Sequence, residues 1–270
     1  MCPSRHRYRR GPCALNIIVC IKAVPASVKN PTPKSDGSGI VTEGDLFMNE
    51  SDDYALEQAL LLKKGFGTTV TALTVGSVRY QDILHVSLAK GADQAIRIDA
   101  DEFDPNIVSF ILSRAIGTMK HDLILTGIES SDGMSSQIGI SVGAQLKLPY
   151  VYAVTKLECG DTQDSLSVTR ELGSGRYQTL EVTKPALLCV QSGIVPLTYT
   201  PVVKLIHARR KAIPCLSLSE LGITDEALSL RRKAKVVEVR PSEKNNATVW
   251  LSGNPEQLAV EIIDKIAKAL

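Results

Sequence analysis

Residues 127–139, GIESSDGMSSQIG, combine residue types that bind anions in proteins. Gly127 and Gly133 allow the backbone to approach a ligand closely. Four serines supply hydroxyl donors: Ser130, Ser131, Ser135 and Ser136. A helix expected over 135–147 would present unpaired amides at its N-terminus, where the dipole alone favours an anion by ~0.3–1 kcal/mol. This composition predicts a phosphate cradle, and a surface loop stabilised by Ser and Asp is the alternative.

Other kinds of chemistry are not predicted. The 127–139 tract lacks the GxxxxGK[ST] pattern of P-loops and has no lysine. The six cysteines form no CxxC pair and the four histidines show no ligand spacing, so we expect reduced thiols and no metal site. No Ser-His-Asp or Cys-His set can be assembled. Asp52 and Asp53 are expected to stabilise the first turn of a helix rather than to form an acid–base pair.

The elements that must position this tract alternate between strands and helices. Strands are expected at 15–21, 69–76, 94–99 and 122–126, and helices at 51–64, 79–90, 105–120 and 135–147. Four such alternations predict a doubly wound, mostly parallel α/β sheet of Rossmann-like, adenine-nucleotide-hydrolase-like type. Ligands of such sheets bind beyond the carboxyl ends of the strands, and the tract follows the fourth strand.

The pattern changes after Pro149. Strand-like segments at 150–158, 164–172, 176–183 and 185–191 follow one another without helices, which predicts antiparallel hairpins at one edge of the sheet. Residues 191–214 are expected to form a loop. The rest of the chain is polar and weakly patterned until an amphipathic helix that begins at Asn254-Pro255. Such a lone helix must pack on something, in this chain or in another.

The charge balance excludes a nucleic-acid footprint. The net charge of +2 depends on Arg5, Arg7, Arg9 and Arg10. Without these four residues the chain has 27 basic and 29 acidic side chains, and its net charge is −2. Residues 1–14 are expected to be a disordered leader or the result of a misassigned start, rather than an export signal. Because no apolar run approaches the ~20 residues that span a membrane, we expect a cytoplasmic protein.

Several segments, in the same order, resemble the β subunit of electron transfer flavoproteins. Residues 15–25, LNIIVCIKAVP, are similar to the family's opening strand with its Val-Lys-x-Val-Pro. Residues 49–59 resemble Asn-Pro-Phe-(Asp/Cys)-Glu-x-Ala-x-Glu-x-Ala, and residues 87–98 resemble Ala-Leu-Ala-Met-Gly-Ala-Asp-x-x-Ile. Residues 168–188 follow the pattern Val-x-Arg-Glu-x-x-x-Gly…Pro-Ala. The resemblance extends from about Leu15 to the end of the chain.

The 127–139 tract then resembles a family loop, Gly-x-Gln-Ala-x-Asp-Gly-(Asp)-x-x-x-Gln-x-Gly. Asp132, Gly133, Gln137 and Gly139 coincide with it. In the family this loop binds the phosphate of AMP or, in electron-bifurcating members, the diphosphate of a second FAD. The resemblance implies such a site; we favour AMP, and a second FAD stays open. The implied cofactor-binding residues are Cys20, Ala23, Asn49, Glu50, Ser51, Asp52, Val75, Gly76, Gly127, Asp132, Gly133, Met134, Ser135, Ser136, Gln137, Ile138 and Gly139.

The resemblance also implies an αβ heterodimer. The α subunit would hold the redox FAD, while this chain adds a nucleotide-binding domain, 15–213, and an arm, 214–270, that packs on the α subunit. The implied activity is electron transfer between a dehydrogenase and an acceptor, so the chain itself would not be an enzyme. The alternative is a stand-alone adenine-nucleotide-binding protein of the universal-stress or nucleotide-alpha-hydrolase type, which would have no need of residues 214–270.

The chain departs from the family pattern in places. Glu129-Ser130 replaces Gln-Ala, and Met134 replaces an acidic residue. Residues 191–203 replace Asn-x-Pro-Arg-Tyr-Pro-Ser-Leu, and only Tyr199 of the Arg-Tyr pair is kept. That region contains the family's docking segment for dehydrogenases. We therefore expect a divergent member with a dehydrogenase of its own.

Overall fold

A computed structural model describes residues 15–25, 44–160, 164–233, 237 and 248–269. The leader expected at 1–14 lies outside the described residues. These residues fall into two compact units, the first running from 15 to 233 and the second containing 237 and 248–269. Each unit is considered by itself.

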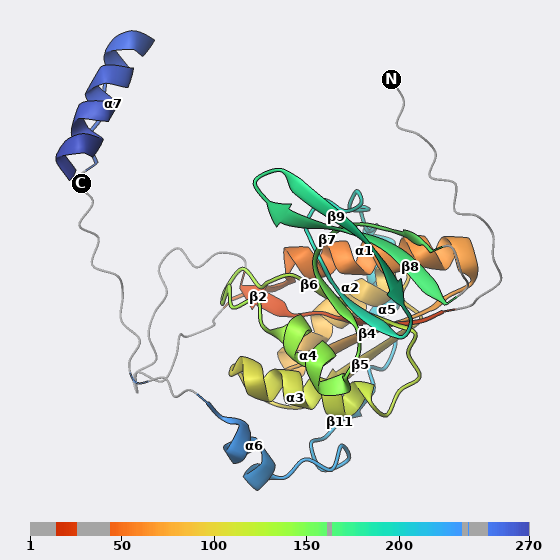
Figure 1. The fold of residues 1–270 in the computed structure, drawn as a ribbon. Helices are drawn as coiled ribbons and strands as arrows, with labels where there is room; N and C mark the ends of the chain where they lie inside the picture. The colour runs from red at the N-terminus through yellow and green to blue at the C-terminus, as the bar shows by residue number, and fades with distance from the viewer. Residues whose placement is uncertain (1–14, 26–43, 161–163, 234–236, 238–247, 270) are drawn as a thin grey trace. The chain divides into compact units, whose positions relative to one another are not determined.

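The first unit is built on a nine-stranded sheet with the order β11-β5-β4-β1-β6-β10-β7-β8-β9 (Figure 1). The strands are parallel from β11 through β7, whereas β8 and β9 are antiparallel to their neighbours. This arrangement confirms the predicted doubly wound fold with an antiparallel edge. The strands are β1 (Asn16–Cys20), β4 (Thr69–Val75), β5 (Gln94–Ile98), β6 (Leu123–Gly127), β7 (Tyr150–Cys159), β8 (Ser165–Gly173), β9 (Arg176–Thr183), β10 (Ala186–Val190) and β11 (Cys215–Leu216).

Helices cover both faces of the sheet. On one face lie α1 (Glu50–Phe66) and α2 (Gln81–Lys90), and on the other lie α3 (Pro105–Ile116) and α4 (Ile138–Leu146) (Figure 1). Alternate residues of β1 serve the two layers, since Ile17 packs in the core under α1 while Ile18 packs in the core under α3. Burial on both faces explains why these strands are continuous apolar runs in the sequence.

A second, two-stranded antiparallel sheet contains β2 (Ala23–Pro25) and β3 (Leu46–Met48). Asn49 directly follows β3, and its backbone N–H donates to the carbonyl of Lys22 at 2.9 Å. The short sheet therefore brings the start of α1 to the carboxyl end of β1. Ligands of parallel α/β sheets bind at this edge.

The boundaries of α1, α2, α3 and α4 lie within about four residues of the expected ones, and the largest difference at a helix start is that of α4. Asp104 caps α3 by accepting a hydrogen bond from the Asn106 amide at 2.8 Å, with Pro105 as the first helical residue. The expected helix start at Ser135 is wrong, because α4 begins at Ile138. Met134 and Ser136 have φ angles of 45° and 53°, and this left-handed backbone cannot continue a right-handed helix.

The segment 185–191 was expected in an edge hairpin, and that expectation is wrong. Its strand, β10, lies between β6 and β7 and runs parallel to both. All five residues of β10 are buried, which requires a central position rather than an edge. The antiparallel edge therefore contains only β7, β8 and β9 among the described strands.

Two further parts differ from the expected loop and arm. Helix α5 (Val202–Ala208) lies within the expected loop 191–214 and packs beside α2. Beyond it, β11 pairs with β5, and α6 (Asp225–Arg231) packs on α3. Leu221, Ile223 and Leu228 are buried in the core on the α3 side. The structure thus includes residues 215–233 in the first unit.

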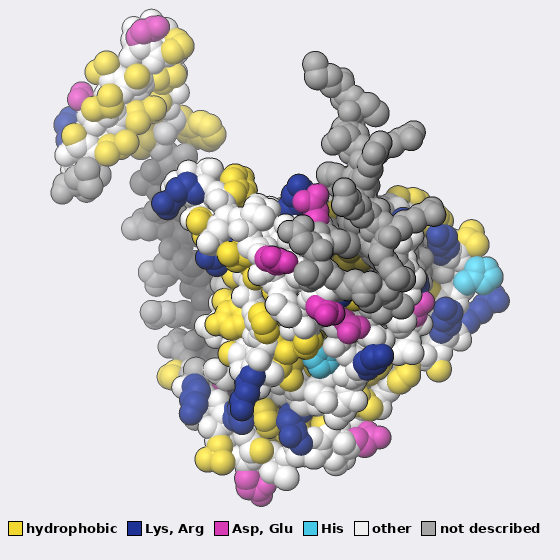
Figure 2. Space-filling model, turned by 45° about the vertical axis from the view of Figure 1, so that its right-hand side comes forward, with side chains coloured by type: hydrophobic (Ala, Val, Ile, Leu, Met, Phe, Trp, Pro, Cys, Tyr) yellow, Lys and Arg dark blue, Asp and Glu magenta, His cyan; other side chains and the backbone are white. Residues whose placement is uncertain are grey.

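The second unit contains the expected amphipathic helix, α7 (Pro255–Ala269). Its start is stabilised by a reciprocal pair in which Asn254 accepts from the Gln257 amide at 2.9 Å and Gln257 accepts from the Asn254 amide at 3.2 Å. Hydrophobic side chains gather along its surface (Figure 2), including Val260, Ile262, Ile263 and Ile266. None of the helices in the described parts of the chain has the length and apolar character needed to cross a bilayer.

Candidate functional site

A cavity of about 350 Å³ opens at the carboxyl ends of β1, β4 and β6, beside the start of α4. The chain proceeds from β1 to β4 on one side and later places β6 on the other, so the strand order reverses at this point. Open α/β sheets bind ligands at such a reversal. Eleven of the predicted site residues line this cavity: Cys20, Asn49, Asp52, Val75, Gly127, Gly133, Ser135, Ser136, Gln137, Ile138 and Gly139.

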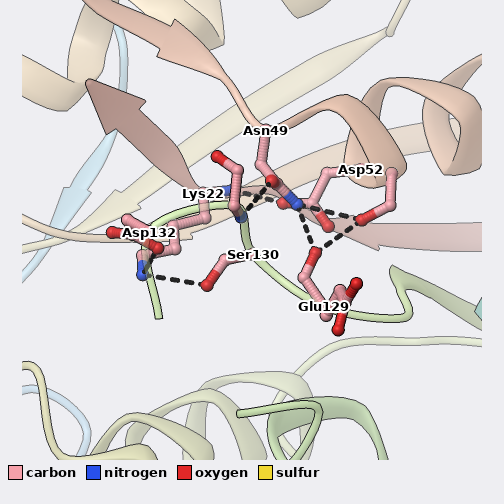
Figure 3. A network of polar contacts seen from close by, with 8 residues as sticks. Lys22, Asn49, Asp52, Glu129, Ser130 and Asp132 are labelled. Carbon is pink, nitrogen blue, oxygen red and sulfur yellow. Dashed lines mark hydrogen bonds and ion pairs between the residues drawn. The ribbon is translucent and has the colours of Figure 1, made fainter. Parts of the chain in front are cut away.

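Asp52 connects three elements at the base of the cavity (Figure 3). One carboxylate oxygen accepts from the Gly127 amide at 2.8 Å and the other accepts from the Lys22 amide at 2.9 Å. The first turn of α1 is thereby fastened to the ends of β6 and β1. Gly127 is required here, because a Cβ would lie 2.1 Å from the Ser51 hydroxyl and 2.5 Å from Asp52 Oδ1.

Asn49 and Ser51 fix the loop after β6. Both side chains donate to the carbonyl oxygen of Glu129, Asn49 at 2.7 Å and Ser51 at 2.6 Å. Asn49 Oδ1 accepts from the amide of Ser131 at 3.1 Å. Both residues are almost completely buried, so these hydrogen bonds are shielded from water. Asn49 and Ser51 were predicted to bind the cofactor directly, and in the structure their side chains hold the 127–139 tract in place.

Lys22 is the one basic side chain on the cavity wall among the residues that the structure describes, and it was not among the predicted site residues. Its ammonium donates to Asp132 Oδ1 at 2.6 Å and to the Ser130 hydroxyl at 3.2 Å (Figure 3). The signal that could have identified it is its place directly after β1, at the edge where the other site residues gather. Asp132 itself is off the cavity wall and acts through this ion pair.

The remaining predicted site residues also lie off the wall. Ala23 is buried in β2, and Glu50 is exposed at the start of α1. Gly76 is buried, and a Cβ there would lie 2.2 Å from the Tyr80 ring. Met134 is 70% exposed in the left-handed turn that precedes α4.

The glycines of the tract have different structural roles. Gly139, in the first turn of α4, permits close packing on the sheet, because a Cβ would lie 2.5 Å from both Cys189 Sγ and Thr126 Oγ1. Gly133 has no such constraint, since a Cβ would meet only the Ser130 hydroxyl at 3.5 Å, an ordinary contact. Protein neighbours therefore do not require glycine at position 133, and the expectation that Gly133 lets the backbone approach a ligand stays a prediction.

The charges around the cavity are mainly acidic. Asp52, Glu102 and Glu129 line it together with Lys22. Burial raises the pKa of Asp52 to about 7, although its two backbone hydrogen bonds lower it. Burial likewise raises the pKa of the Cys20 thiol, which therefore stays protonated and is not a nucleophile.

Part of the cavity wall is apolar, and most of it comes from an element that the sequence did not assign to the site. Phe103 and Pro105 precede and begin α3, while Val108 and Leu112 lie along that helix. Val75 completes this wall from β4. A ligand in the cavity would have polar contacts at the 127–139 tract and apolar contacts at α3, which suits a molecule with an anionic end and a flat apolar end.

Among the described residues, no three His, Cys, Asp or Glu side chains form a group that could hold a metal ion. The fold and the cavity together define a doubly wound α/β protein with a small-molecule pocket at the reversal of its strand order. The chain belongs to the electron transfer flavoprotein family and is a divergent member of its β-subunit family. A profile of the electron transfer flavoprotein domain matches residues 38–221.

Several known electron transfer proteins are similar to this chain over most of its length. The electron transfer flavoprotein subunit beta of Methylophilus methylotrophus is 30% identical over 259 residues, covering 93% of this chain and 98% of the relative. That of Bacillus subtilis is 31% identical over 220 residues, covering 80% and 84%. A protein of Anaerotignum propionicum named acryloyl-CoA reductase electron transfer subunit gamma is 29% identical over 271 residues, covering 93% and 98%.

Proposed function

We propose that this chain is the β subunit of a heterodimeric electron transfer flavoprotein and that its cavity binds AMP. The observation that carries the proposal is the cavity at the strand-order reversal, bounded by a serine-rich loop and the start of α4. The first amides of a helix have no intrahelical acceptor and bind anions readily. The resemblance to the family loop that binds AMP or FAD supports assigning that anion to an adenine nucleotide.

The donor set of the cavity fits a phosphate. Ser135, Ser136 and Gln137 line it directly before α4. Lys22 can exchange part of its contact with Asp132 for a phosphate oxygen, because its side chain is 37% exposed. The apolar wall of α3 would then accept the base. We propose these residues as the ligands of the nucleotide.

The size of the cavity favours AMP over a second FAD. Ligand pockets usually range over ~300–1,000 Å³, and this one, at about 350 Å³, lies near the lower end. A mononucleotide fits that volume better than a dinucleotide whose flavin ring must also be enclosed. AMP has no redox chemistry, so its role is to stabilise the loop between β6 and α4.

The partner that we propose is an electron transfer flavoprotein α subunit. It would hold the FAD, which accepts and donates electrons, while this chain contributes no reacting group. Helix α7 supplies an apolar surface suited to such a partner, with Val260 and Ile263 both more than 60% exposed. A dehydrogenase would dock at residues 191–203, electrons would pass to an acceptor of unknown identity, and the complex would work in the cytoplasm.

Co-expression with a candidate α subunit encoded beside it tests this function. We expect the two chains to co-purify at a 1:1 ratio with flavin absorbance near that of one FAD per pair. The flavin should be reduced by a dehydrogenase and reoxidised by an acceptor without other additions. A chain that purifies as a stable monomer with bound ATP would instead support the stand-alone nucleotide-binding alternative.

A further inference from the structure

We propose that Lys90 is a positioning residue that holds the segment 197–201 in place through Glu57. This inference rests on the proposed function for its consequence, since that segment lies in the region expected to dock a dehydrogenase. The contacts themselves come from α1, α2 and the segment before α5, and are independent of the nucleotide cavity.

Lys90, the last residue of α2, lies between two carboxylates of α1. Its ammonium donates to Asp53 Oδ1 at 2.5 Å and to Glu57 Oε1 at 2.8 Å. The side chains of Lys90 and Glu57 are each only 7% exposed, and that of Asp53 is 21% exposed. Burial alone would lower the pKa of Lys90, but hydrogen bonds to the two carboxylates raise it, so the ammonium stays charged.

The carboxylate of Glu57 also accepts two hydrogen bonds from Thr198. Its Oε1 accepts from the Thr198 backbone N–H at 3.1 Å, and its Oε2 accepts from the Thr198 hydroxyl at 3.0 Å. These two hydrogen bonds connect Thr198 to Glu57 in the middle of α1, although the two residues are 141 positions apart in the sequence. A buried carboxylate can keep such bonds only if a cation neutralises it. Lys90 supplies that cation.

The fixed point is followed by an exposed apolar surface. Tyr199 is 79% exposed, and Val202 and Val203, at the start of α5, are 61% and 64% exposed. A cavity of about 390 Å³ lies between this segment and the α1–α2 pair, with Lys90 and Thr198 on its wall. Loss of the Thr198 anchor would therefore release the side chain of Tyr199 from one defined position.

The test is amide hydrogen exchange of Thr198 in the purified αβ complex. In Lys90→Met, Glu57 loses its counter-ion, and we expect the Thr198 amide to exchange at least about tenfold faster, as expected for losing a hydrogen bond to a charged group. Lys90→Arg should retain most of the protection. The double variant Lys90→Met/Thr198→Arg should restore protection of residues 197–201, because it supplies a cation to Glu57 from position 198, which contacts that carboxylate.

Two further variants keep the test decisive. Lys63→Met is the matched control: Lys63 pairs with Asp93 at 2.5 Å on the wall of the same cavity but does not contact Glu57, so exchange at 197–201 should stay unchanged. Thr198→Val removes only the hydroxyl bond and remains informative if Lys90→Met does not fold; it should speed exchange less than threefold.

Unchanged Thr198 protection in Lys90→Met would overturn the proposal, as would failure of the double variant to restore it in a folded complex. The bound nucleotide is measured in the same samples and should be retained in every variant. A wild-type complex without a nucleotide would contradict the proposed function while leaving the exchange result to decide the role of Lys90.

Discussion

Asp52 accepts a hydrogen bond from the backbone N–H of Gly127 across 2.8 Å, and this contact joins the first turn of α1 to the end of β6. The two residues are 75 positions apart in the sequence. Asp52 also accepts from the Lys22 amide, so three segments that border the cavity meet at one buried carboxyl group. The shape of the proposed nucleotide site depends on this junction.

Substituting Gly127 with Ala should damage the junction. The new Cβ would lie 2.1 Å from the Ser51 hydroxyl and 2.5 Å from Asp52 Oδ1, so α1 and β6 must separate. Overpacking of this kind typically costs ~1–3 kcal/mol of stability. We expect a lower Tm and loss of the bound nucleotide from the αβ complex. Gly65→Ala, at an exposed position of α1 where a Cβ would meet nothing within 4 Å, is the control and should retain both.

Stability should fall as pH rises through the range in which Asp52 loses its proton. Burial raises the pKa of Asp52 to about 7 from an unfolded value of 3.8. Between these values the folded state binds the proton and the unfolded state does not, so the free energy of unfolding decreases with rising pH. The negative charge that Asp52 acquires above about pH 7 should also weaken binding of the anionic nucleotide. Denaturant titrations from pH 5 to pH 8 measure the effect.

Asp52→Asn separates this contribution from other titrating groups. The amide has one acceptor oxygen for two backbone donors, so the variant should be less stable at every pH by ~1–3 kcal/mol. Its decline between pH 5 and pH 8 should be shallower than that of the wild type. Equal pH slopes in the two proteins would assign the effect to other groups.

Removing the ammonium of Lys22 should weaken nucleotide binding without affecting flavin content. A charge-assisted hydrogen bond to phosphate is among the stronger polar contacts, and partial exposure reduces its contribution. We therefore expect Lys22→Met to lower AMP affinity about tenfold, as measured by equilibrium dialysis of the αβ complex. Lys156→Met, which removes an exposed pair with Glu158, is the control. Unchanged affinity in Lys22→Met would show that Lys22 does not bind the phosphate and that the backbone amides bind it instead.

Charged substitutions on α7 should prevent assembly with the α subunit. Ile262 and Ile266 are 44% and 55% exposed on this helix and are separated by one turn. Burying such a side chain stabilises a complex by ~1.5–3 kcal/mol, so Ile262→Asp/Ile266→Asp should weaken association at least about 100-fold. Lys265→Ala, on the same helix, should have little effect. Normal co-purification of the double variant would show that α7 does not contact the partner.

The sequence predicted the fold where the pattern was local. Short apolar runs predicted the buried strands, and Asp104 and Pro105 predicted the start of α3. The structure confirms these predictions. The position of β10 was wrong, because pairing between β6 and β7 is set by contacts distant in the chain. Helix α5 was missed because its exposed Val202, Val203 and Ile206 give no core-facing pattern.

The candidate site was predictable in part. The 127–139 tract was identified from residue chemistry, and its neighbours Cys20, Asn49 and Val75 came from the family resemblance; all line the cavity. Lys22 was missed although it directly follows a strand whose carboxyl end borders the site, and the residues in and just before α3, including Phe103 and Val108, were missed because nothing in their local sequence distinguishes them from ordinary core residues. The left-handed turn at Met134 and Ser136, which delays α4, depends on clamping by Asn49 and Ser51 from another part of the chain.

The most direct test of the nucleotide site is the cofactor content of the purified αβ complex. Acid releases the bound ligands, which are then separated and counted against protein. We predict one FAD and one AMP per pair of chains, with the AMP lost and the FAD retained in Gly127→Ala. Two FAD per pair would contradict the assignment of AMP to this cavity, and a complex with FAD but no second nucleotide would contradict the site itself.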